Sequence, residues 1–212
     1  SPECKEWVES RLEKMTLKEK IGQLFIHTVG LMNTDVNRKN IRNAVKEYKV
    51  GGLLFSNGKL VNQVTLTNYA QEMAEIPLMI TFDGEWGLNM RLKEIPAFPR
   101  NRVLGSIEDN ALLYEYGKEV ARQFREIGVH VNFAPVADVD NNPLNPVINT
   151  RSFGGDPENV AQKVIAYSKG LEEGGVLSVS KHFPGHGDTN VDSHKALPVL
   201  NFTRERLDSI EM

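Results

Sequence analysis

The fold is indicated by one stretch, VLSVSKHFPGHGDTNVDSH, which runs from Val176 to His194. Its first five residues, Val176–Ser180, are mostly apolar or β-branched and predict a strand. A cluster of histidine, aspartate, lysine and glycine follows this strand directly. In α/β proteins, loops at the carboxyl ends of parallel strands carry the chemistry. The stretch therefore predicts an α/β fold with a functional site after this strand.

Similar apolar runs occur earlier in the chain and predict four more strands, at Leu24–Val29, Gly51–Phe55, Leu78–Phe82 and His130–Ala134. Amphipathic helical patterns separate these runs. Strands that alternate with helices imply parallel pairing and right-handed crossovers.

The helix boundaries are also indicated by the sequence. Ser106-Ile-Glu-Asp109 is a capping-box pattern, and Gly128 is expected to end the helix that follows it. The apolar face predicted for that helix consists of Leu112, Leu113, Tyr116, Val120, Phe124 and Ile127. Asp156-Pro157 predicts the start of another helix, which Gly174-Gly175 ends. Residues Thr203–Met212 form a last helical segment.

Two long segments, 83–105 and 138–156, interrupt this alternation. Both follow a predicted strand, and enlarged loops at that position favour a (β/α)8 barrel of the TIM type. A doubly wound sheet is the main alternative, but no Gly-x-Gly-x-x-Gly fingerprint follows the first strand. Such a barrel has eight strands in about 250 residues, whereas this chain offers five. We therefore expect residues 1–212 to be a C-terminally incomplete barrel domain holding about the first five βα units.

Composition limits the functional classes. The net charge of −3 gives no electrostatic basis for binding nucleic acid or an anionic membrane. The single cysteine, Cys4, excludes an internal disulfide and a cysteine-based zinc cluster. No apolar run approaches the roughly 20 residues of a membrane span, so no membrane-spanning segment is expected.

Asp192 and His194 are the first candidate catalytic pair. The carboxylate can accept a hydrogen bond from one imidazole nitrogen and fix the direction of the other, which gives a general acid/base. An exposed Asp-x-His with no function is the first alternative. A metal site is the second, and its candidate ligands are His182, His186, Asp188 and His194.

Other candidates follow predicted strand ends. Lys181 and His182 are expected on opposite faces, since side chains alternate along a strand. One of the two would then point into the mouth of the barrel as a hydrogen-bond donor. Asp83 and Arg91 can bind a sugar together, or can form an ion pair that only holds their loop. Arg151 is a further donor, with binding of loop carbonyl groups as its alternative role.

Taken together, these segments resemble the bacterial β-N-acetylglucosaminidases (β-N-acetylhexosaminidases) of glycoside hydrolase family 3. The resemblance covers nearly the whole chain in order, through Met15-Thr-Leu-Lys-Glu-Lys-Ile-Gly-Gln-Leu24, Gly51-Gly-Leu-Leu, Asp83-Gly-Glu-Trp-Gly, Asn132-Phe-Ala-Pro-Val-Ala-Asp138, Asn145-Pro-Val-Ile, Arg151-Ser-Phe-Gly and Lys181 to His194. It implies a retaining glycosidase that releases terminal β-linked N-acetylglucosamine, with peptidoglycan fragments as candidate substrates and without a metal or organic cofactor.

The resemblance also implies individual roles. His194 matches the acid/base and Asp192 its partner, while Lys181 and His182 match a substrate-binding pair. The residues that match those holding the terminal sugar are Asp83, Arg91 and Arg151. A retaining enzyme also needs a carboxylate nucleophile, and no segment here matches the family's aspartate after the seventh strand. We therefore expect the remainder of a longer parent chain to complete the barrel, and this piece alone to be inactive.

Several alternatives remain open from the sequence. The protein can be a family 3 β-glucosidase-like enzyme, a non-catalytic glycan-binding barrel or a metal-dependent hydrolase. The Asp83-Gly-Glu-Trp-Gly motif resembles the larger extracytoplasmic members, so a periplasmic or lipid-anchored location is expected ahead of a cytoplasmic one.

Overall fold

The computed structural model describes all residues, 1–212, and divides them into two compact units, Ser1–Thr81 and Phe82–Met212. Parallel strands and helices build both units, so the predicted α/β class is confirmed. All five predicted strands are present. None of the helices combines the length and the apolar character that crossing a bilayer requires.

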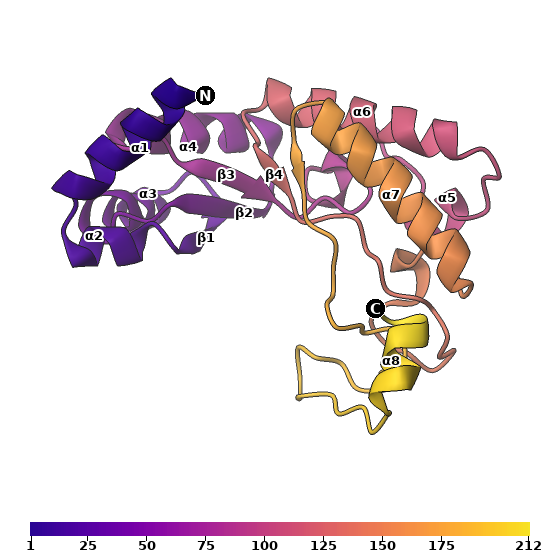
Figure 1. Ribbon diagram of the computed structural model, residues 1–212. Helices are drawn as coiled ribbons and strands as arrows, with labels where there is room; N and C mark the ends of the chain where they lie inside the picture. The colour runs from indigo at the N-terminus through magenta and orange to yellow at the C-terminus, as the bar shows by residue number, and fades with distance from the viewer. The chain divides into compact units, whose positions relative to one another are not determined.

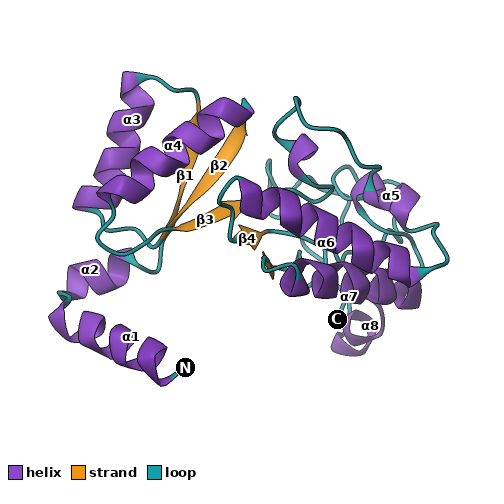
Figure 2. Cartoon of the chain, turned by 90° about the horizontal axis from the view of Figure 1, so that it is seen from above, coloured by secondary structure: helices purple, strands orange, loops and turns teal.

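The first unit contains three parallel strands, which neighbour one another in the order of the sequence. Ile26 lies opposite Gly52, and Gly52 lies opposite Met79. Helices cover the sheet, and Figure 2 shows α3 and α4 against β1 and β2. The elements are α1 (Pro2–Lys14), α2 (Leu17–Gly22), β1 (Ile26–Leu31), α3 (Asp35–Arg42), the π-helical turn η1 (Asn43–Glu47), β2 (Gly52–Gly58), α4 (Leu60–Met73) and β3 (Met79–Phe82).

The second unit begins at the last residue of β3, Phe82, whose carbonyl accepts a hydrogen bond from Phe133 N at 2.8 Å. Strands β4 and β5 are parallel, with Val131 opposite Leu177. The elements of this unit are η2 (Leu88–Met90), α5 (Asn101–Leu104), α6 (Asn110–Glu126), β4 (Val131–Asn132), η3 (Asn149–Arg151), α7 (Pro157–Glu173), β5 (Leu177–Ser178) and α8 (Arg204–Ile210).

Helices α6 and α7 lie side by side along much of their length (Figure 1). Two glycines permit this close approach. A Cβ on Gly117 would lie 2.6 Å from the Tyr167 carbonyl oxygen, and one on Gly170 would lie 2.2 Å from the Tyr114 carbonyl oxygen. Tyr167 itself has no exposed surface. The two helices therefore pack tightly against each other.

Strands β4 and β5 are shorter than predicted, and the chain beyond each of them continues as an ordered loop. The two loops run alongside each other, since Val136 forms an isolated parallel bridge with Lys181. Ala137 N donates to the Lys181 carbonyl at 2.6 Å. This pairing of loops places the residues after Val136 beside those after Lys181.

Most predicted helix boundaries are confirmed. Asp156 caps α7 by accepting from Asn159 N at 3.1 Å, and Thr203 caps α8. The expected capping box at Ser106 is wrong, because α6 begins at Asn110 and the Asp109 carboxylate accepts from Ala111 N at 2.9 Å. The predicted apolar face holds for five of its six residues, which are buried or half-buried, but Leu112 is 56% exposed.

Candidate active site

The loop after β3 carries the first two acidic residues of the site, Asp83 and Glu85. The Asn132 side chain on β4 holds the glycine between them. Its Oδ1 accepts from Gly84 N at 3.0 Å, and its Nδ2 donates to the Gly84 carbonyl at 3.1 Å. Asn132 has no exposed surface. This amide therefore fixes the backbone from which both carboxylates project.

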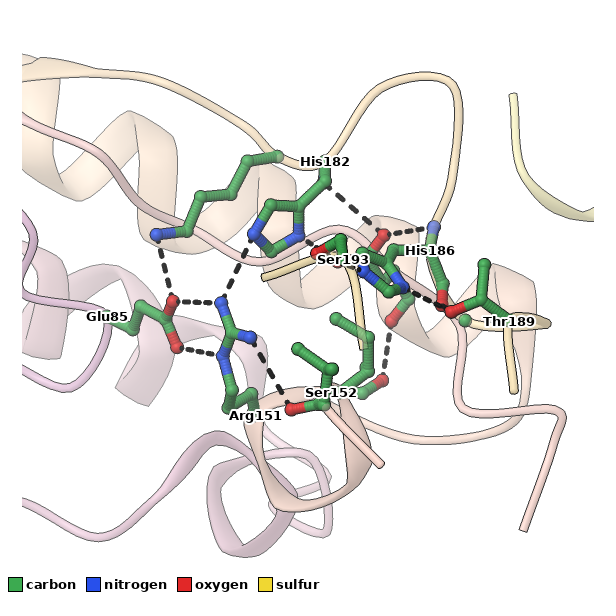
Figure 3. Close-up of polar contacts among 12 residues, drawn as sticks. Glu85, Arg151, Ser152, His182, His186, Thr189 and Ser193 are labelled. Carbon is green, nitrogen blue, oxygen red and sulfur yellow. Dashed lines mark hydrogen bonds and ion pairs between the residues drawn. The ribbon is translucent and has the colours of Figure 1, made fainter. Parts of the chain in front are cut away.

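Glu85 is the centre of the charged cluster (Figure 3). Its fully buried carboxylate accepts from Arg151 Nε at 2.9 Å and from Arg151 Nη2 at 2.6 Å, and it lies 2.8 Å from Lys181 Nζ. Burial alone would lower the pKa of Arg151, but the hydrogen bonds and charge of Glu85 outweigh it and raise that pKa. One carboxylate thus fixes two cations that come from different loops.

Asp83 extends the cluster. Its Oδ1 accepts from Lys181 Nζ at 2.6 Å, its Oδ2 forms an ion pair with Arg91, and its carbonyl accepts from Arg91 Nε at 3.1 Å. Burial acts to raise the pKa of Asp83, but the charges and hydrogen bonds of Lys181 and Arg91 together lower it. Asp83 is therefore an ionised acceptor whose side chain remains 24% exposed.

His182 joins the cluster to a second buried carboxylate, Asp138. The imidazole Nε2 lies 3.2 Å from Arg151 Nη2, and Nδ1 lies 2.5 Å from Asp138 Oδ2. The Asp138 side chain is fully buried, whereas that of His182 is 34% exposed. The exposed part of His182 and the partly exposed Asp83 give the cluster a polar surface that a ligand can reach.

The glycine-rich part of the next loop is held by buried side-chain contacts. His186 Nε2 lies 2.9 Å from Ser193 Oγ, and its Nδ1 contacts Thr189 Oγ1 (Figure 3). Asn145 Nδ2 donates to the carbonyls of His186 and Gly187 at 2.7 and 2.9 Å. The Asn145 Oδ1 accepts from the backbone of its own loop, at Val147 and Ile148. The loop after β5 is thereby fastened to the loop after β4.

Asp192 and His194 form the contact that the sequence suggested. His194 Nδ1 lies 2.8 Å from Asp192 Oδ1, which also accepts from His194 N at 2.9 Å. The backbone N–H of His194, followed by its imidazole, lowers the pKa of Asp192. The His194 side chain is 78% exposed. With Nδ1 engaged by a carboxylate, its Nε2 is free to exchange a proton with a group outside the loop.

The structure thus gathers five of the seven predicted site residues and pairs the other two separately. The five are Asp83, Arg91, Arg151, Lys181 and His182. The expectation that Lys181 and His182 point to opposite faces is wrong, because both side chains contact the Glu85–Arg151 pair. The alternation of a strand does not reach them, since β5 ends at Ser178.

The four ligands considered for a metal have separate partners. His182 contacts Asp138, and His186 contacts Ser193. Asp188 pairs with Arg206 at 2.5 Å, and His194 with Asp192. No group of three or more His, Cys, Asp or Glu side chains is arranged to hold a metal ion.

Sequence reasoning missed Glu85, Asp138 and Asn145, and it considered His186 only as a metal ligand. Glu85 stands two residues after Asp83 at the same strand end, so position alone could have suggested it. Asp138 closes the Asn132–Asp138 motif, but nothing in that motif names its partners. The resulting arrangement offers charged donors and acceptors to a ligand rich in hydroxyl groups, beside a carboxylate-bound imidazole that can move a proton.

Comparisons with known proteins show which family the chain resembles. The family model "Glycosyl hydrolase family 3 N terminal domain" matches residues 16–212. Beta-hexosaminidase A of Pseudoalteromonas piscicida is 34% identical over 181 residues, which cover 79% of this chain and 30% of that protein.

Two solved structures are also similar. A glycoside hydrolase family 3 beta-N-acetylglucosaminidase from Paenibacillus sp. str. FPU-7 superposes with a TM-score of 0.83 at 38% identity, over 93% of this chain and 38% of that one. Beta-glucoside phosphorylase BglX bound to 2FGlc gives a TM-score of 0.91 at 26% identity, over 100% of this chain and 38% of that one. These neighbours are of the TIM-barrel type, which confirms the predicted fold class. The chain spans 30% of the curated relative and 38% of each solved chain.

Proposed function

This chain belongs to glycosyl hydrolase family 3, and from that premise we propose that the protein containing it releases terminal β-linked N-acetylglucosamine from glycans. Residues 1–212 belong to the barrel domain of that protein in this proposal. The relatives named as a beta-hexosaminidase and a beta-N-acetylglucosaminidase support the sugar. Peptidoglycan fragments are the natural substrate class that we propose.

The observation that carries the proposal is the coexistence of a fixed polar cluster and an exposed, carboxylate-bound imidazole. Asp83 and the cations around it bind the hydroxyl groups of the terminal sugar. His194, oriented by Asp192, donates a proton to the leaving oxygen and then removes one from the incoming water. The nucleophile of the retaining reaction is a carboxylate outside residues 1–212.

The test compares p-nitrophenyl β-N-acetylglucosaminide with the corresponding glucoside as substrates of the full-length protein. We expect kcat/KM to favour the N-acetylglucosaminide by at least about tenfold, since a substrate-specific contact is worth about 1–3 kcal/mol. A preference for the glucoside contradicts the proposed sugar. Binding of both sugars without turnover supports a non-catalytic glycan-binding barrel instead.

The similarity to a beta-glucoside phosphorylase supports a second candidate, phosphorolysis of β-glucosides. Phosphorolysis transfers the glycosyl group to inorganic phosphate and yields a sugar phosphate, whereas hydrolysis yields the free sugar. Product analysis with and without phosphate separates the two reactions. A rate that requires phosphate favours the second candidate.

A further inference from the structure

Asp138 divides its carboxylate between two histidines. Its Oδ2 lies 2.5 Å from His182 Nδ1, and its Oδ1 accepts the backbone N–H groups of His182 at 3.3 Å and of His186 at 2.7 Å. The Asp138 side chain has no exposed surface. A buried charge of this kind is retained where it is paired or fully hydrogen-bonded.

The partners of His182 define which nitrogen carries its proton. A guanidinium only donates hydrogen bonds, so the Nε2 that lies 3.2 Å from Arg151 Nη2 is the accepting nitrogen. Nδ1 then carries the proton and donates it to Asp138 Oδ2. The carboxylate of Asp138 therefore selects the one tautomer of His182 that is compatible with Arg151.

The other branch from Asp138 leads to the proton donor. The N–H of His186 is bound to Asp138 Oδ1, and the His186 ring holds Ser193 Oγ at 2.9 Å. Ser193 stands between Asp192 and His194 in the sequence. Thr189 donates its hydroxyl proton to the His186 carbonyl at 2.9 Å, so Thr189 Oγ1 accepts from His186 Nδ1, and Ser193 donates to Nε2.

We propose that Asp138 is a positioning residue that serves both halves of the site, an inference that rests on the proposed function. Through His182 it aligns Arg151 for sugar binding, and through His186 it sets the start of the loop that carries Asp192 and His194. Asp138 does not touch the substrate in this proposal. It acts only through the two histidines.

The decisive variant is Asp138→Asn in the full-length protein. The amide oxygen still accepts from His186 N, but the amide nitrogen that replaces Oδ2 can only donate to His182 Nδ1. His182 must then carry its proton on Nε2. The Nε2–H of His182 and the Nη2–H of Arg151 are both donors, so the hydrogen bond between them is lost. We expect kcat/KM for the p-nitrophenyl N-acetylglucosaminide to fall by about 100-fold or more. The analogy is the catalytic triad of serine proteases, where replacing the aspartate by asparagine leaves the histidine in the wrong tautomer.

Ser152→Ala is the matched control. The Ser152 hydroxyl donates to the Asp138 carbonyl at 2.6 Å and is buried, so its loss disturbs the same residue without changing the carboxylate. We expect Ser152→Ala to lower the melting temperature while kcat/KM stays within about threefold. Equal kinetic losses in both variants, or wild-type kinetics in Asp138→Asn, overturn the proposal.

A second measurement needs neither a stable variant nor turnover. Nitrogen-15 NMR of the imidazoles at neutral pH reports which ring nitrogen of His182 is protonated in the wild-type protein. We expect the Nδ1–H tautomer, and finding Nε2–H overturns the positioning role. If the protein does not cleave the N-acetylglucosaminide but His182 has the expected tautomer, the proposed function fails while the assignment of Asp138 to His182 stands.

Discussion

Glu85 and Arg151 form a bidentate ion pair, with Nε donating to Oε2 at 2.9 Å and Nη2 donating to Oε1 at 2.6 Å. Glu85 follows β3, whereas Arg151 ends η3, so the pair links two loops that are far apart in the sequence. The planar guanidinium restricts the geometry of both side chains. The direction of the Arg151 side chain is therefore set by a carboxylate that is fully buried.

Glu85→Gln tests this arrangement. The amide removes the negative charge that Arg151 and Lys181 share, and both cations remain largely buried. We expect the free energy of unfolding to fall by about 3 kcal/mol, as for a broken buried ion pair, and KM for the sugar substrate to rise. Urea unfolding and steady-state kinetics of the full-length protein measure the two effects.

The control for that variant is Glu119→Gln, which removes an ion pair between Glu119 and Arg122 on the exposed side of α6. An exposed pair contributes about 0–1 kcal/mol, so this variant should remain close to the wild type. Similar stability losses for the two glutamates would contradict the central role of Glu85.

His194→Ala tests the proton donor. We expect kcat/KM for a natural glycan to fall by about 10²–10⁴-fold, the usual contribution of a general acid/base. A p-nitrophenyl leaving group departs without a proton, so the loss on that substrate should be smaller. Equal losses on both substrates would remove His194 from this role.

The pH dependence of stability tests Asp83. Although burial acts to raise it, the charges and hydrogen bonds of Lys181 and Arg91 hold the pKa of Asp83 in the folded protein below its ordinary value, so its ionised form stabilises the folded state. This contribution is complete above the unfolded pKa and is lost as the pH falls through the lower folded pKa. The difference in unfolding free energy between wild type and Asp83→Asn should therefore be constant near neutrality and shrink in acid below about pH 4. A difference that stays unchanged down to pH 2 would contradict this assignment.

Gly187→Ala tests the contact between the two loops. A Cβ at this position would lie 1.7 Å from the Val139 carbonyl oxygen, so the backbone must move. We expect a loss of about 2 kcal/mol in unfolding free energy, in the range of overpacked sites, and reduced activity because the loop to His194 shifts. Gly30→Ala is the control, since no atom lies within 4 Å of a Cβ there. Unchanged stability in Gly187→Ala would mean that the loops are not in contact.

The sequence was informative where a local rule decides the structure. Apolar runs predicted every strand, and Asp156 and Thr203 cap helices as their residue types suggest. Local rules failed where tertiary contacts decide. The proline- and glycine-rich segments after β4 and β5 pair through one isolated bridge rather than through longer strands, so alternation did not describe Lys181 and His182.

Some residues of the candidate site could be named from the sequence, but its network of contacts could not. Asp83, Arg91 and Lys181 are charged residues near strand ends, and the sequence predicts where the strands end. The role of Glu85 depends on a partner 66 residues away, and that of Asp138 on histidines 44 and 48 residues away. Only the folded arrangement of the loops brings such pairs together.

Asn145 has a practical consequence for protein engineering. Its amide nitrogen donates to the carbonyls of His186 and Gly187, and its amide oxygen accepts from the backbone of its own loop. In a chimera that receives the 181–194 segment from a homologue without the matching 138–156 segment, the two carbonyl groups no longer lie where the Asn145 amide can donate to them. Exchange of specificity between relatives by segment grafting therefore has to move the two segments as one cassette.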